Sequence, residues 1–310
     1  MEKREYRRLG MMVVALLLCA VLVLGALVMG PTRRKALSHE VKQWIPWSLF
    51  APKVETQAAS VYVYDLTADH VVIKKNADEA RFPASLTKLM TVYESLKHID
   101  DLSAIAPVDK KSYQRLVSEN ASMAGFYGNE RTTYRDLLYG AMLPSGGECA
   151  DSLAINLAGS REDFAAWMNA RAKALGLTKT HFQNPDGMDE EGQQMSARDV
   201  GELLRVALDD GNFRAILTKM HYTSTKTRNH PKGIAMTSTV LDHFEGHEIS
   251  GWTLLGGKTG TTMKAGLCLA TLCEKKGHEY IVVVMGVPIE DFATRGEGHV
   301  EDTINLMEAL

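Results

Sequence analysis

Residues 267–286 read Leu267-Cys-Leu-Ala-Thr-Leu-Cys273, then a short polar segment ending in Lys275-Lys276-Gly277, then Glu279-Tyr-Ile-Val-Val-Val-Met-Gly286. Two apolar runs rich in β-branched residues, separated by a glycine turn, predict a β-hairpin. Just before it, Trp252-Thr-Leu-Leu-Gly256 predicts a further strand. The C-terminal third is therefore expected to form adjacent antiparallel strands.

Another hairpin is predicted near the start of the domain, with strands at 60–65 and 70–74. The segments between the two hairpins have helical features. The expected helices are 85–96, 136–142, one from the capping serine Ser160 to Gly176, one from Ser196 to about Leu208, and a last one at 297–310. Strands at both ends with helices between predict an α+β fold, an antiparallel sheet with a helical cluster.

The N-terminus of the 310-residue chain differs from the rest. Leu9–Met29 contains no charged residue, and about 20 apolar residues are needed for a helix to cross a bilayer. We expect a basic cytoplasmic tail at 1–8, a transmembrane anchor at 9–30, a linker at 31–56 and a folded domain at 57–310.

The alternative for this segment is a cleaved signal peptide. The apolar part of a signal peptide is usually about 7–15 residues, so the length here favours a retained anchor. Basic residues flank the span on both sides, so charge decides the orientation only weakly. The expected location is the cell membrane, with a single span and an extracytoplasmic domain.

Charge and cysteine content exclude several classes of function. The chain carries a net charge of −3, but residues 1–35 hold seven of its 35 basic side chains and two of its 38 acidic ones, so the remainder is near −8. A domain this acidic is a poor candidate for binding nucleic acid. The four cysteines, Cys19, Cys149, Cys268 and Cys273, have no metal-like spacing and predict neither a disulfide framework nor a cofactor.

Ser85 and Lys88 are the first candidate catalytic residues. They are three positions apart at a predicted helix start, so they lie on one face and the amine can reach the hydroxyl. A serine is a weak nucleophile unless a base lies beside it, and a lysine can act as that base when burial or a second cation lowers its pKa. Lys258 is the candidate for the second cation.

Lys258-Thr259-Gly260 is the second candidate motif, and it follows a predicted strand. A lysine with neighbouring hydroxyls suits a terminal carboxylate. Glycine at 260 is expected to let a substrate backbone approach without a Cβ in the way. The two motifs occur once each, in this order, on a helix and a strand.

Five stretches of this sequence resemble the serine-type D-alanyl-D-alanine carboxypeptidases, the low-molecular-weight penicillin-binding proteins of the peptidase S11 type. These stretches are 83–91, 136–146, 182–188, 196–199 and 257–262. The similarity continues through 265–287 and covers about residues 57–310 in all. The resemblance implies a penicillin-binding, β-lactamase-like transpeptidase fold. It also implies removal of terminal D-alanine from peptidoglycan stem peptides ending in D-Ala-D-Ala, with inhibition by β-lactams.

The resemblance also implies roles for individual residues. Ser85 would be the nucleophile, Lys88 its base and Ser145 a proton relay to the leaving amine. The backbone N–H groups of Ser85 and Thr261 would form the oxyanion hole. The expected substrate-binding residues are Lys258, Thr259, Gly260, Thr261, Thr262 and, by similarity near the carboxylate site, Arg295.

The sequence departs from the family pattern at Ser145-Gly146-Gly147, where the family usually has Ser-Gly-Asn, so Gly147 replaces the asparagine. Glu148 or Gln194 could supply the missing polar group. The family's second β-rich domain and C-terminal amphipathic anchor are not expected here, so the N-terminal span is expected to provide the tether.

Four other functions remain open. Gly147 leaves a weakly active or non-catalytic wall-binding scaffold as an alternative, and D,D-endopeptidase action is another. A class A β-lactamase would need a glutamate for deacylation, but Glu190 and Glu191 are expected in a loop. A metallopeptidase could use His243 and His247, yet no third ligand is evident, and a hydrogen-bonded loop pair is expected instead.

Overall fold

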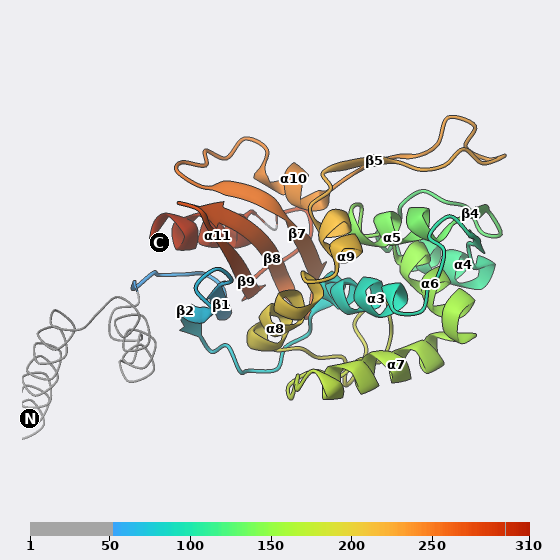
Figure 1. The fold of residues 1–310 in the computed structure, drawn as a ribbon. Helices are drawn as coiled ribbons and strands as arrows, with labels where there is room; N and C mark the ends of the chain where they lie inside the picture. Colours follow the sequence, from blue (N-terminus) through green and yellow to red (C-terminus); the bar gives the residue numbers. More distant parts are fainter. Residues whose placement is uncertain (1–51, 295) are drawn as a thin grey trace, which may run out of the picture. The chain divides into compact units, whose positions relative to one another are not determined.

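The computed structural model describes residues 52–294 and 296–310, and Pro52–Leu310 forms one compact unit. Its main sheet has five antiparallel strands in the order β2-β1-β9-β8-β7 (Figure 1). The strands are β1 (Ser60–Asp65), β2 (His70–Lys75), β7 (Thr253–Thr262), β8 (Gly266–Lys275) and β9 (His278–Val287). The predicted α+β class is confirmed, because the two ends of the chain supply one sheet.

The predicted hairpin at 267–286 is the centre of this sheet. Cys273 faces Tyr280, and Lys276 and Gly277 make the turn with φ of +54° and +80°. Side chains alternate between two apolar layers, because successive residues of a strand point to opposite faces. In β1, Val61 and Val63 face one layer, while Tyr62 and Tyr64 face the other. The sheet is therefore covered on both faces.

Helices pack on each face of the sheet. The α-helices are α3 (Thr87–Leu96), α4 (Lys110–Ser118), α5 (Tyr134–Met142), α6 (Gly147–Ala158), α7 (Arg161–Ala174), α8 (Ala197–Ala207), α9 (Gly211–Leu217), α10 (Thr239–Phe244) and α11 (Gly298–Glu308). The sequence did not predict α4, α6, α9 or α10. It also missed two short ribbons, β3 (Ile105–Pro107) with β4 (Arg131–Thr133), and β5 (His221–Thr223) with β6 (Ala235–Thr237).

The two predicted capping serines are confirmed. The Ser160 hydroxyl accepts a hydrogen bond from the N–H of Asp163, and Ser196 accepts one from Asp199. These contacts satisfy N–H groups that a helix start leaves without an intrahelical acceptor. They determine where α7 and α8 begin.

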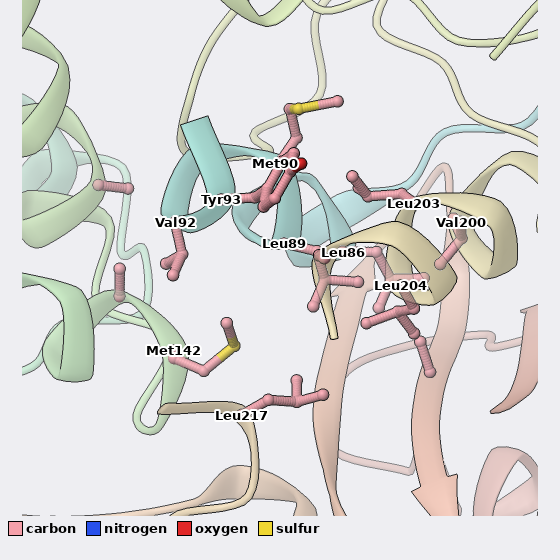
Figure 2. Close-up of a cluster of buried hydrophobic side chains, with 14 of the residues drawn as sticks. Leu86, Leu89, Met90, Val92, Tyr93, Met142, Val200, Leu203, Leu204 and Leu217 are labelled. Atoms are coloured by element: carbon pink, nitrogen blue, oxygen red, sulfur yellow. The ribbon is translucent and has the colours of Figure 1, made fainter. Parts of the chain in front are cut away.

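Helix α3 lies at the centre of the larger apolar layer. Figure 2 shows its side chains between α8 on one side and the ends of α5 and α9 on the other. Leu86 and Leu89 are fully buried, and full burial of a leucine side chain contributes about 1.5–3 kcal/mol. This packing holds the start of α3 in place, and with it Ser85 and Lys88.

The predicted tail at 1–8, anchor at 9–30 and most of the linker lie outside the described residues. Within 52–294 and 296–310, no helix combines the length and apolar character that a membrane span requires. The three cysteines in this part of the chain are buried and unpaired, as the sequence predicted.

Candidate active site

Ser85 lies in a single 3-10 turn, η2 (Ala84–Leu86), directly before α3. The residue before it, Ala84, has φ of +47°, a left-handed conformation that is uncommon for residues with a side chain. Lys88 Nζ donates a hydrogen bond to Ser85 Oγ over 2.9 Å and another to the carbonyl oxygen of Asp186 over 2.5 Å. The structure thus brings the candidate nucleophile and base into contact.

Two buried lysines determine the electrostatics of the site. Burial lowers the pKa of Lys88, although carboxylates led by Asp186 act in the opposite direction. Burial also lowers the pKa of Lys258 well below its usual range, and the neighbouring charge of Lys88 lowers it further. A lysine held in this way is neutral in a larger fraction of molecules, and the neutral amine is the form that accepts a proton.

Lys258 lies deeper than the sequence suggested. Its side chain is 0% exposed, and Nζ donates to the carbonyl oxygen of Thr259 over 3.0 Å. The expectation that its amine directly receives a carboxylate therefore does not fit this arrangement, because the amine is already covered by protein. Thr259 is 6% exposed and Thr261 is partly exposed, so both side chains are less covered than that of Lys258.

Gly260 allows β7 to approach the backbone of the turn that contains Ser85. A Cβ at this position would lie 2.9 Å from the nitrogen of Ser85 and 3.1 Å from that of Leu86. Close approach of a substrate to Gly260 stays a prediction. The absent side chain lets β7 run against the turn that carries the nucleophile.

Ser145 follows α5 in a left-handed conformation with φ of +64°. It is buried, and its Oγ has no hydrogen-bond partner among the described residues. Thr239 connects the chain before Ser145 to β7. Its N–H donates to the carbonyl of Leu143 over 3.0 Å, and its Oγ1 is 2.7 Å from Thr259 Oγ1. Thr239 was not predicted, because no local motif marks it.

Position 147 faces an apolar neighbour. A Cβ on Gly147 would lie 3.0 Å from Leu116 Cδ2, a buried side chain of α4.

The adjacent Glu148 is buried, and its Oε1 accepts the N–H groups of Ala124 and Gly125. Burial raises the pKa of Glu148. Its carboxylate thus binds the 119–130 loop. Gln194 forms a backbone bridge with His181, and replacement of the asparagine by Glu148 or Gln194 stays a prediction.

A buried ion-pair cluster supports the base, and sequence reasoning missed it. Asp186 accepts hydrogen bonds from Arg115 over 2.5 Å and Arg161 over 3.0 Å, and Asp151 accepts from the same two arginines. Burial opposes ionisation of Asp186, yet Arg161 and the other nearby cations hold its pKa below its usual range. The backbone carbonyl of this aspartate is the one that Lys88 contacts, so the cluster determines where that carbonyl lies.

The loop that contains Asp186 makes two further contacts near the site, through Gly187 and Asp189. Gly187, with φ of +82°, allows close contact with the turn before Ser85, since a Cβ there would lie 2.2 Å from the carbonyl oxygen of Ala84. Thr262 Oγ1 donates to Asp189 over 2.7 Å. Glu190 and Glu191 are exposed loop residues, as predicted. Arg295 lies outside the described residues.

The comparisons with known proteins identify the family. The D-alanyl-D-alanine carboxypeptidase family, Peptidase_S11, matches residues 48–289. DacC, the D-alanyl-D-alanine carboxypeptidase of Escherichia coli, is 32% identical over 243 residues, which are 76% of this chain and 58% of DacC. This chain belongs to the D-alanyl-D-alanine carboxypeptidase family.

Solved structures agree with this assignment. The Streptomyces K15 DD-transpeptidase has a TM-score of 0.71 and 26% identity, covering 83% of this chain and 98% of that one. Penicillin-binding protein D2 from Listeria monocytogenes, in its ampicillin-bound form, has a TM-score of 0.66 and 25% identity, covering 83% and 99%. The chain spans 57–60% of the length of the first curated relatives that it matches.

Proposed function

We propose that this protein is a serine D,D-carboxypeptidase that removes the terminal D-alanine from peptidoglycan stem peptides and is inhibited by β-lactams. The observation that carries the proposal is the 2.9 Å contact between Lys88 Nζ and Ser85 Oγ, in a site where burial lowers the pKa of the lysine. Membership of the carboxypeptidase family supports it.

The first half-reaction would form an acyl-enzyme. Ser85 Oγ would bond to the carbonyl carbon of the penultimate D-alanine while its proton passes to the Lys88 amine. The N–H groups of Ser85 and Thr261 would stabilise the oxyanion. As the C–N bond breaks, a proton would pass through the Ser145 hydroxyl to the leaving D-alanine. Water would then hydrolyse the ester and restore Ser85.

Substrate would bind along the edge of β7. Because Lys258 is fully covered, we assign the direct carboxylate contacts to the hydroxyls of Thr259 and Thr261, and to Arg295 by family resemblance. Lys258 would act through its charge on Lys88 and through its contact with the Thr259 carbonyl. Thr262 would hold the adjacent loop through Asp189.

We also propose that the protein is held at the cell membrane by residues 9–30, with the domain outside and residues 1–8 in the cytoplasm. Support comes from the uncharged stretch Leu9–Met29. Fractionation of cells expressing the full chain should place it in the membrane pellet. Recovery of a shortened chain in the soluble extracytoplasmic fraction would instead indicate a cleaved signal peptide.

The first experiment treats the full chain with a fluorescent penicillin, with Ser85→Ala as the control. We expect a covalent adduct on the wild type and none on the variant, because only the serine oxygen forms the ester. Release of D-alanine from a pentapeptide ending in D-Ala-D-Ala then tests the reaction. A folded wild-type protein that forms no adduct would contradict the proposal and favour the scaffold alternative.

A further inference from the structure

Three side chains with metal-binding atoms meet between α10 and α11, outside the site described above. His243 is on α10, while Glu297 and His299 are at the start of α11. Their ligand atoms all lie within 4.8 Å of one another. His243 Nδ1 is 2.7 Å from Glu297 Oε2, and His299 Nδ1 is 3.9 Å from the same oxygen. The two imidazole rings are perpendicular, with centroids 4.8 Å apart.

The sequence suggested a different pair of metal-binding histidines, His243 and His247. His243-Phe-Glu-Gly-His247 places two histidines four residues apart, but α10 ends at Phe244 and Gly246 has φ of +85°. His247 is not in the cluster. The other two ligand candidates lie more than 50 residues away along the chain, as the 54-residue separation of the His243–Glu297 bond shows. Only the tertiary structure brings them together.

We propose that His243, Glu297 and His299 form a zinc-binding site. Two imidazoles and one carboxylate are a common zinc ligand set, with three protein ligands leaving a fourth position for water. Bonds of about 2.0–2.1 Å place neighbouring tetrahedral ligand atoms about 3.3 Å apart. The two contacts to Glu297, at 2.7 Å and 3.9 Å, fall on either side of that separation, and all three ligand atoms lie within 4.8 Å of one another.

The cluster combines a buried ligand with an accessible entrance. The His299 side chain is 0% exposed, His243 is 14% exposed and Glu297 is 38% exposed. An ion would enter past Glu297 and end against the buried imidazole. Metal binding requires neutral imidazole and ionised carboxylate, so the hydrogen bond between His243 and Glu297 would be replaced by bonds from both side chains to the ion.

The site would affect the position of α10. This helix starts at Thr239, four residues before His243, and Thr239 contacts Thr259 Oγ1 on β7 and the carbonyl of Leu143. A metal ion joining α10 to α11 would therefore hold the helix that supports Thr259. Zinc is not assigned any part in the acyl-transfer chemistry.

The test uses the full chain, without a polyhistidine tag, after dialysis against chelator. Calorimetric titration with Zn²⁺ should give one saturable site per chain, and Zn²⁺ should raise the Tm. Co²⁺ should give the visible d–d absorption of four-fold coordination. His243→Gln and Glu297→Gln should each weaken Zn²⁺ binding at least tenfold, since each removes one ligand.

Two control variants separate this site from nonspecific histidine binding. His230 forms a 2.7 Å pair with Glu130, outside the three-residue cluster, and His247 is the sequence neighbour of His243. His230→Gln and His247→Gln should bind Zn²⁺ as the wild type does. Absence of saturable binding, or equal loss in the control variants, would overturn the proposal. The readout is independent of acylation, so it is separate from the test of the carboxypeptidase.

Discussion

The rate at which Ser85 is acylated should rise with pH, because Lys88 acts as a base only when its amine is neutral. Burial lowers the pKa of Lys88 from 10.5, so the neutral amine appears at lower pH than in a solvated lysine. We expect the rate of acylation by a β-lactam to rise with pH through this lowered pKa and then to level off. Stopped-flow measurement between pH 5 and 10 would test this.

The matched control for this prediction is Lys88→Arg. A guanidinium does not lose its proton in this range, so acylation should fall by about 10²–10⁴-fold, the usual contribution of a general base. A pH-independent rate, or an active Lys88→Arg variant, would contradict the role of Lys88 as base.

Gly260 is the second residue whose role can be tested alone. A Cβ there would lie 2.9 Å from the Ser85 nitrogen, and backbone cannot move aside as a flexible side chain can. Gly260→Ala should slow acylation by about 10²–10³-fold, as loss of one oxyanion-hole donor does. Gly211→Ala is the control, because nothing lies within 4 Å of its added Cβ. Equal acylation rates for the two variants would show that the close approach of β7 to the Ser85 turn does not affect acylation.

At the scale of elements, the cluster of Arg115, Arg161, Asp151 and Asp186 joins α4, α6 and α7 to the loop beside Lys88. Arg161→Ala leaves two buried carboxylates with only Arg115, and removing one partner of a buried pair is strongly destabilising. We expect the free energy of unfolding to fall by about 3 kcal/mol. Equilibrium unfolding in urea measures this value.

The control for this prediction is Arg205→Ala. Arg205 is 41% exposed and pairs with Glu202 on the surface of α8, so its loss should cost about 1 kcal/mol or less. If Arg161→Ala were no more destabilising than Arg205→Ala, the cluster would not be a structural support. Because Asp186 positions the carbonyl that contacts Lys88, slower acylation by Arg161→Ala is also expected.

At the scale of the whole molecule, Asp302 connects the beginning of the domain to its last helix. Its two carboxylate oxygens accept the N–H groups of Gln57 over 2.9 Å and Ala58 over 2.7 Å. Asp302→Ala leaves the buried N–H of Ala58 without this acceptor, while water can reach the partly buried N–H of Gln57, and an unsatisfied buried group costs about 1–3 kcal/mol. We expect a loss of about 1–3 kcal/mol of stability, measured by thermal and chemical unfolding, with acylation of the folded protein unchanged.

The neighbouring Glu301 is the control for Asp302. It accepts an exposed hydrogen bond from the Gln57 side chain, so Glu301→Ala should change stability by no more than about 0.5 kcal/mol. A similar loss in both variants would indicate a general effect of charge on α11 and would argue against the specific connection.

The sequence predicted the elements whose signals are local. Alternating and β-branched runs identified all but the exact ends of β1, β2, β8 and β9, and capping serines located α7 and α8. It missed α6, which opens with Gly146 and Gly147 and has no side-chain cap. It also missed α10, a six-residue helix whose position depends on packing against β7.

The chain by itself determined the α+β class, the family and the two candidate catalytic motifs, because strand pattern, helix caps and the Ser85–Lys88 spacing depend on nearby residues. The tertiary structure alone decided the rest. It buried Lys258, turned Gly260 toward the Ser85 backbone, set Asp186 beside Lys88 and assembled His243 with His299. The physical reason is that burial, electrostatic environment and close contact depend on residues distant in the chain, which no local pattern specifies.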